Sequence, residues 1–220
     1  MYVMGLDTAL KRCSVAILRE GEVLADESAG MERGHAEHLA PMASAALSKA
    51  GLGVRDLDRV GVVVGPGGFT GVRVALSFAR GLGVGTGIEI VGVTSLAALA
   101  ADVDVNSELV APVIDARRGQ VYAALYDGAG ACILAPFVET PEHALECLHE
   151  AAGNKKFVLT GSGAPLLDQS ADGGAEIDAK TVARIAAGAP LPAGPPAPLY
   201  LRPPDAKPGK PGVFEMGAPS

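Results

Sequence analysis

The residues best suited to chemistry in this chain lie in a glycine-rich run, Gly65–Arg73. The run reads Gly-Pro-Gly-Gly-Phe-Thr-Gly-Val-Arg; the three valines before it predict a buried strand, and the segment after it predicts a helix. A strand, a glycine-rich turn and a helix N-terminus together offer backbone N–H groups to an anion such as phosphate. The candidate phosphate-binding residues are Gly65, Gly67, Gly68 and Thr70. The alternative is a tight turn without a ligand, and composition alone leaves the two interpretations about even.

The run differs from two familiar phosphate-binding motifs. No Gly-Lys-Ser/Thr closes it, as a P-loop requires, and its glycine spacing does not fit G-x-G-x-x-G. A second glycine-rich turn, which contains Gly161 and Gly163, also precedes a predicted helix and adds two weaker candidates.

Two aspartates follow apolar strands in a repeated pattern. Asp7 follows the predicted strand 2–6, and Asp115 follows the predicted strand 109–114; in both places a second apolar strand, a turn and a third strand come next. The repeat predicts two similar lobes, with an aspartate loop from each facing a cleft between them. Carboxylates there could bind a divalent ion or act as a general base. The alternative is that each aspartate braces its own turn, which we favour for Asp115 and leave open for Asp7.

Alternating strands and helices predict an α/β protein with partly parallel pairing. Apolar residues recur three and four positions apart over 35–50 and 70–84, which predicts two amphipathic helices. Further elements are expected at 89–93, 95–101, 120–126, 132–138, 141–152, 156–160 and 179–187. The expected divisions are a first lobe at 1–103, a smaller second lobe at 104–189 and a tail at 190–220, where ten of the 16 prolines lie.

Composition restricts the classes of function. The formal net charge of −7 and the pI near 5.1 argue against a chain that grips nucleic acid alone, although a partner could supply the basic charge. The three cysteines show no C-x-x-C spacing, so neither a disulfide framework nor a zinc site is indicated. With no basic and apolar leader and no long apolar span, we expect a soluble cytoplasmic protein without a membrane partner.

Several of these segments resemble the TsaB family, formerly called YeaZ. The similarity runs from Met4 to about Arg202 and is most specific in the first half. Its motifs are Gly5-Leu6-Asp7-Thr8, His35 with Met42, Gly65–Arg73, Val93–Ala100, Ile114–Arg117 with Val121-Tyr122, and Pro198–Arg202. The resemblance implies an actin/hexokinase/Hsp70-like (ASKHA) α/β fold, with two repeated lobes of mixed sheets and flanking helices.

The resemblance also implies a function. The family is a subunit of the bacterial machinery that makes N6-threonylcarbamoyladenosine (t6A) at position 37 of tRNAs that read ANN codons. Its partners are the catalytic paralogue TsaD and the small ATPase TsaE, and tRNA is reached only through the complex. We therefore expect an accessory subunit with no catalytic residues, metal site or cofactor of its own; ATP or ADP and a divalent metal would belong to the partner complex.

TsaD itself is the main competing assignment. TsaD-like proteins carry a His-x-x-x-His pair that holds a metal, and two histidines four apart on a helix face one ligand. Here Ser95 and Leu99 occupy those positions, and leucine cannot coordinate a metal. His35 and His38 are another possible metal pair, but no third ligand is near, so a capping or interface role is favoured.

By resemblance, the two amphipathic helices form the surface that binds TsaD, or a second copy of the chain when TsaD is absent. The expected interface residues are His35, Leu39, Met42, Ala46, Arg73, Val74 and Phe78. The alternative is that both helices only cover their own sheet.

Two other functions are alternatives. A stand-alone small-molecule kinase of the same fold would need an adenosine pocket and a catalytic aspartate in the cleft, and the short second half hardly accommodates them. A peptidase has no Ser-His-Asp or metal arrangement to support it.

Overall fold

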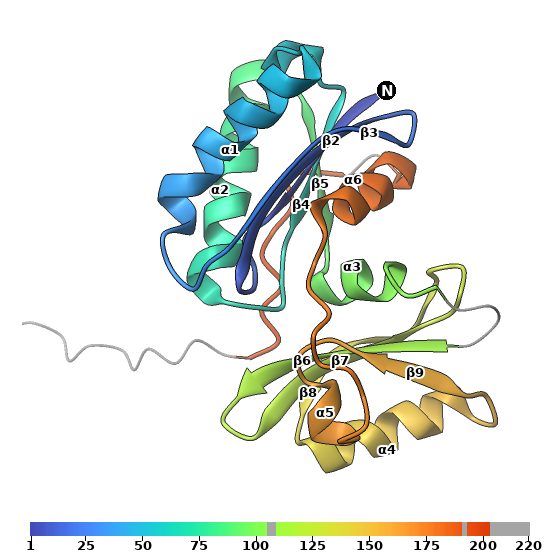
Figure 1. Ribbon diagram of the computed structural model, residues 1–220. Coiled ribbons are helices and arrows are strands. Elements are labelled where there is room, and N and C mark those ends of the chain that lie inside the picture. The colour runs from blue at the N-terminus through green and yellow to red at the C-terminus, as the bar shows by residue number, and fades with distance from the viewer. Residues whose placement is uncertain (105–108, 191–192, 203–220) are drawn as a thin grey trace, which may run out of the picture.

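The computed structural model describes residues 1–104, 109–190 and 193–202, which form two mixed β-sheets with helices on their faces (Figure 1). The first sheet has the strand order β3-β2-β1-β4-β5. Its strands are β1 (Tyr2–Asp7), β2 (Arg12–Arg19), β3 (Glu22–Gly30), β4 (Arg59–Val63) and β5 (Glu89–Val93). β1, β2 and β3 pair antiparallel, whereas β4 lies parallel to both β1 and β5.

The second sheet repeats this arrangement with the order β8-β7-β6-β9. Its strands are β6 (Leu109–Arg117), β7 (Gln120–Tyr126), β8 (Cys132–Glu139) and β9 (Phe157–Thr160). The antiparallel set β6, β7 and β8 and the parallel β9 correspond to β1, β2, β3 and β4. The predicted α/β class and internal repeat are therefore confirmed, and the arrangement is the one expected for the actin/hexokinase/Hsp70-like fold.

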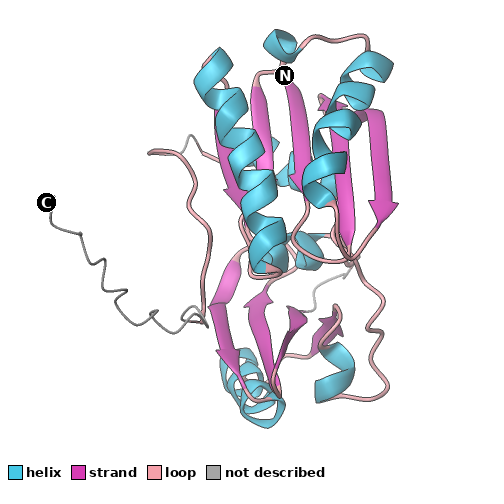
Figure 2. Cartoon of the chain, turned by 90° about the vertical axis from the view of Figure 1, so that its left-hand side faces the viewer, coloured by secondary structure: helices cyan, strands magenta, loops and turns pink. Residues whose placement is uncertain are grey.

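The helices form layers around the two sheets (Figures 1 and 2). Helices α1 (His35–Ala50) and α2 (Phe69–Thr86) cover one face of the first sheet, and α6 (Ala179–Gly188) covers the other. Helix α3 (Ser95–Ala101) lies between α6 and the second sheet, whose far face carries α4 (Pro141–Ala152) and α5 (Ala164–Leu167). A short 3₁₀ turn, η1 (Val54–Asp56), precedes β4. No helix in the described part of the chain is long and apolar enough to span a membrane.

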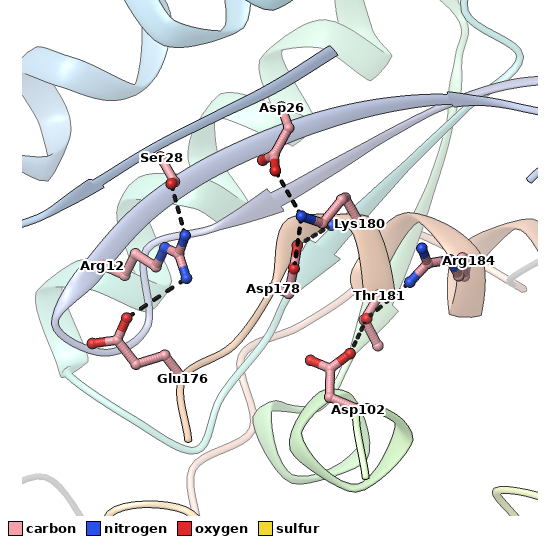
Figure 3. Close-up of polar contacts among 9 residues, drawn as sticks. All are labelled: Arg12, Asp26, Ser28, Asp102, Glu176, Asp178, Lys180, Thr181 and Arg184. Atoms are coloured by element: carbon pink, nitrogen blue, oxygen red, sulfur yellow. Dashed lines mark hydrogen bonds and ion pairs between the residues drawn. The ribbon is translucent and has the colours of Figure 1, made fainter. Parts of the chain in front are cut away.

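Polar contacts fix α6 on the first sheet although the chain reaches it from the second (Figure 3). Lys180 Nζ lies 2.7 Å from Asp26 Oδ2 on β3 and also pairs with Asp178. The Thr181 hydroxyl donates a hydrogen bond to Asp102, at the end of α3. Helix α6 thus belongs by sequence to the second half and by packing to the first.

One apolar cluster runs continuously from the first sheet to the second. It contains residues of β1, β2, β4 and β5 on one side, of β6 and β7 on the other, and of α3 and α6 between them. Ile177, just before α6, is fully buried in it. Because this cluster fills the space between the sheets, the two halves pack as one body.

The described part of the C-terminal region is a strap, which we define as residues 193–202. The Leu199 N–H donates to Val64 O next to β4, and Arg80 on α2 donates to Pro196 O. The strap then reaches the β6–β7 turn, where Arg202 donates to Ala116 O. Part of the predicted tail is therefore docked on the body, and residues 203–220 lie outside the described residues.

The glycine-rich turn is packed directly against the turn between β1 and β2. Gly68 N–H donates to Ala9 O at 2.7 Å, and the Thr8 hydroxyl donates to Gly71 O at 2.6 Å. A Cβ at Gly71 would lie 1.9 Å from Thr8 O, closer than any side chain allows. Glycine at this position is therefore explained by close backbone packing.

The Gly71→Ala substitution is expected to destabilise the fold by about 1–3 kcal/mol, because the backbone of Thr8 or of α2 must move to admit the methyl group. The control is Gly81→Ala on the same helix, where a Cβ meets nothing within 4 Å. This change is expected to stabilise by about 0.5–1 kcal/mol. Urea unfolding of both variants tests the comparison, and equal effects would contradict the packing explanation.

Candidate functional site

Asp7 ends β1 and is fully buried. Its Oδ1 accepts a hydrogen bond from the Ala9 N–H at 2.8 Å, so the carboxyl braces its own turn. Among the described residues, its Oδ2 has no hydrogen-bond partner, and neither does the buried hydroxyl of Ser14, the residue paired with Asp7 across the β1–β2 ladder. The carboxyl therefore does not face an open cleft, as the repeat had predicted, but lies inside the protein.

Burial dominates the electrostatics of this carboxyl. It raises the pKa of Asp7 from 3.8 to about 7, against the opposing effects of the Ala9 hydrogen bond and the Arg12 charge. Arg12 itself is 3.6 Å from Glu176 and donates to the Ser28 hydroxyl (Figure 3). Glu176 also raises the pKa of Asp7, since two nearby carboxylates repel each other.

Asp115 occupies the equivalent place in the second half, with one difference from the expected loop. It lies inside β6, because that strand continues through an irregularity to Arg117. Its Oδ1 accepts the Arg117 N–H at 2.7 Å, the same two-residue contact that Asp7 makes, and its Oδ2 lies 3.1 Å from Arg117 Nη1. These two contacts are the geometry expected if Asp115 braces its own turn, which is the role that we favoured.

The second glycine-rich turn also uses its backbone groups internally. Gly163 N–H donates to Val113 O, and a Cβ at Gly163 would lie within 3 Å of three β6 atoms, among them Asp115 N at 2.9 Å. In the first turn, Gly65 O accepts the Ser95 N–H, while Gly67 packs against Ala9. In both halves a glycine-rich turn therefore packs on the strand end that carries the aspartate.

Two grooves on the surface lie elsewhere. One of about 490 Å³ lies between α1 and α2, and a second lies between α4 and β9; the candidate aspartates and glycines line neither. Thr70 alone of the phosphate-binding candidates borders the first groove. Within the described residues, no group of three His, Cys, Asp or Glu side chains is arranged to hold a metal ion.

The groove between α1 and α2 coincides with the helices expected to bind a partner. Arg73 is exposed at its rim, and Val74 and Phe78 line it while half-buried. His35 and Met42 are also half-buried. Helix α1 begins after Gly34 without a side-chain cap, so the capping role considered for its histidines is absent.

Two of the expected interface residues belong to the core beneath the groove. Leu39 is 1% exposed and Ala46 is 0% exposed, and both pack with β1, β2 and β4 residues. The apolar spacing of Leu39 and Ala46 therefore reflects their contact with the sheet. Ala46 has no exposed surface that a partner could contact. Leu39 forms part of the floor of the groove, and the exposed Ala36, Ala40 and Ser77 line it beside Val74 and Phe78.

Sequence reasoning missed an exposed aromatic and arginine stack at the rim of this groove, which Phe69 and Arg73 also line. The Phe69 and Tyr200 rings stack at 5.3 Å, and the Arg73 guanidinium lies 3.6 Å from the centre of the Phe69 ring. The signal was the motif Pro198–Arg202, which carries an aromatic and an arginine within a proline-rich region.

We expect the Asp7→Asn variant to remove a pH dependence of stability. In the unfolded chain Asp7 ionises near pH 4, whereas the folded carboxyl keeps its proton until about pH 7. The wild type should therefore lose stability relative to the variant as pH rises from 4 to 7, by on the order of a few kcal/mol. Urea unfolding across this range measures the difference. Asp115→Asn is the control, and identical pH profiles for wild type and Asp7→Asn would contradict the expectation.

The chain is similar in sequence to known proteins. Residues 23–187 match the family model described as "TsaD: tRNA N6-adenosine threonylcarbamoyltransferase". The chain is 35% identical over 126 residues to a Bacillus subtilis protein named "tRNA threonylcarbamoyladenosine biosynthesis protein TsaB", a match that covers 57% of this chain and 55% of that protein. It is 37% identical over 212 residues, 94% of each chain, to an uncharacterized protein of Mycobacterium tuberculosis. The chain thus spans about half the length of the named relative.

Solved structures agree with the sequence comparison. A Pseudomonas aeruginosa protein described as similar to peptidase YeaZ matches with a TM-score of 0.79 and 30% identity over 91% of this chain and 99% of that chain. YeaZ of Pseudomonas aeruginosa matches with a TM-score of 0.73 and 30% identity over 84% and 90%. On these similarities, the chain belongs to the TsaB/YeaZ family, which is related to TsaD and whose named relatives are described as tRNA threonylcarbamoyladenosine biosynthesis proteins.

Proposed function

We propose that this chain is an accessory subunit of the t6A machinery, which binds and activates a TsaD-type catalytic subunit and has no catalysis of its own. The observation that supports the proposal is a difference in exposure: Asp7 at the end of β1 is buried, whereas the groove between α1 and α2 is open. The glycine-rich turns pack on the strand ends that carry the aspartates, with Gly68 and Thr70 exposed, and the open groove is largely apolar. A TsaE-type ATPase would join the same complex, and ATP or ADP with a divalent ion would bind there.

The positions that distinguish the chain from TsaD support the same conclusion. Ser95 and Leu99, which stand where TsaD-like proteins are expected to carry their histidines, are 0% and 1% exposed. Leu99 packs in the apolar cluster between the sheets. A metal at this place would have to enter a packed apolar core, which disfavours both independent catalysis and the kinase alternative.

The partner surface proposed here is the α1–α2 groove, which Phe78 lines, together with the half-buried Met42 on α1. Helices with small residues at their outer face allow close approach, and methionine adapts to different partners. A second copy of the chain would use the same face when TsaD is absent. Self-association and TsaD binding are then mutually exclusive.

The function is tested by reconstituting t6A formation from TsaD, TsaE, threonylcarbamoyl-adenylate synthase and tRNA, with and without this chain. Formation of t6A is expected only when the chain is present, and the chain alone is expected to form none. Equal yields with and without the chain would contradict the proposal.

The shared surface is tested with Phe78→Asp and with Ser77→Arg, whose exposed position keeps the core intact. Each is expected to weaken both self-association and TsaD binding at least tenfold, because a charge is buried without a partner. Val84→Asp is the control, since Val84 lies on the same helix and is 90% exposed. Analytical ultracentrifugation and titration with TsaD measure both associations. Loss of one association with the other unchanged would contradict a shared surface.

A further inference from the structure

A single cationic side chain stands at the rim of the α1–α2 groove. Arg73 on α2 is exposed, and among the described residues that line this groove it is the only charged one. By contrast, Arg12, Arg59 and Arg117 each lie within ion-pair distance of a carboxylate, at 3.6, 3.4 and 3.1 Å. In the described part of the chain, the contacts of Arg73 are instead with two aromatic rings and a tyrosine hydroxyl, and none is with a carboxylate. Its charge therefore has no counter-charge there.

The strap holds this arginine in place through Tyr200. Arg73 Nε donates a 2.7 Å hydrogen bond to the Tyr200 hydroxyl, and the central carbon of its guanidinium lies 3.6 Å from the centre of the Phe69 ring. The Phe69 and Tyr200 rings stack with their centres 5.3 Å apart. Stacking on an aromatic face restricts a side chain that otherwise samples many rotamers. One edge and one face of the Arg73 guanidinium are thus occupied.

The strap itself is fixed on both sides of Tyr200. The Leu199 N–H donates to Val64 O at 2.8 Å, and the Arg202 side chain donates to Ala116 O at 3.2 Å. These two contacts tie the strap to the first sheet on one side and to the β6–β7 turn on the other. The tyrosine is therefore a firmly held support for the arginine that it contacts.

The remaining donors of the guanidinium suit a carboxylate. A guanidinium carries five N–H donors, and in Arg73 the Nε–H is used by Tyr200. The N–H groups on Nη1 and Nη2 make no hydrogen bond within the described residues, and one from each nitrogen can pair end-on with the two oxygens of a carboxylate. Because the arginine is already held, less side-chain freedom is lost when such a pair forms.

The two partners proposed for this groove differ in whether they can supply that carboxylate. In a two-fold symmetric pair of identical chains, the same surface faces itself. No aspartate or glutamate is among the described residues that line the groove, so Arg73 would meet no acidic lining residue of a second copy. A different protein is free of this symmetry and can place an aspartate or glutamate opposite the arginine. The charge therefore favours the different protein over a second copy.

We propose that Arg73, positioned by Tyr200 of the strap, pairs with a carboxylate of the TsaD-type subunit seated in the groove, and that this pair distinguishes that subunit from a second copy of the chain. The proposal rests on the proposed function, which places both partners on this groove. Tyr200 is then a positioning residue, because it acts on the partner through Arg73. The strap thereby becomes part of the partner surface.

The charge is tested by titrating the full chain with TsaD at several salt concentrations. Arg73→Gln is expected to weaken TsaD binding at least tenfold and to make the remaining affinity less sensitive to salt, because a charge pair is lost. Self-association, measured by analytical ultracentrifugation, should stay within about twofold of the wild type or become stronger. Arg80→Gln is the matched control and should change neither association. Arg80 is exposed on the same helix and donates to Pro196 O of the strap, but it does not line the groove.

The role of Tyr200 is tested by a double-mutant cycle. Tyr200→Phe keeps the ring and removes the hydroxyl that accepts the Arg73 hydrogen bond. It is expected to weaken TsaD binding about threefold in the otherwise wild-type chain and to have no effect when Arg73→Gln is already present. Equal losses in the two backgrounds would mean that Tyr200 acts independently of the arginine, and the positioning role would be wrong.

The outcomes separate this proposal from the proposed function. If Arg73→Gln leaves TsaD binding unchanged, or weakens self-association to the same extent, the carboxylate pair is wrong. The proposed function is judged separately, by the loss of TsaD binding in Phe78→Asp and by the requirement for the chain in t6A formation. If the wild-type chain does not bind TsaD, both proposals are wrong.

Discussion

Apolar packing between the two sheets is the constraint on which the other features of this molecule depend. Leu96 and Leu99 on α3, Ile114 on β6 and Ile177 before α6 meet in one buried cluster. Burial of large aliphatic side chains contributes roughly 1.5–3 kcal/mol each, so separating the sheets would be costly. In a two-lobed protein with an open cleft, the space between the lobes is accessible to solvent. In this protein the apolar cluster fills that space.

This packing determines what the polar residues at the strand ends can do. Because Asp7 is fully buried at the end of β1, its carboxyl is desolvated and its pKa rises to about 7. The glycine-rich turns approach the same strand ends so closely that their glycines serve backbone packing. With the interior closed, open surface features such as the α1–α2 groove are left for function.

Much of the fold could be predicted from sequence because its elements are locally determined. The three-and-four spacing and Gly51 defined α1 at 35–50, and Thr140 with Pro141 marked the start of α4, both as observed. The site was less predictable, since it depends on contacts between distant residues. Arg73 meets Tyr200 across 127 positions, and Asp7 is influenced by Glu176; neither contact leaves a periodic signal. Leu39 and Ala46 show the related problem that an apolar stripe does not say whether its residues face a sheet or a partner.

The central claim is that packing between the sheets leaves the chain without a nucleotide site of its own, so that it acts through its surface. Isothermal titration calorimetry of MgATP into the isolated full chain tests this claim most directly. The account predicts no saturable heat up to about 1 mM nucleotide, which corresponds to binding weaker than about −4 kcal/mol. Micromolar affinity that is lost in the Asp7→Ala variant would contradict it, because that result would require an open, functional site at the end of β1.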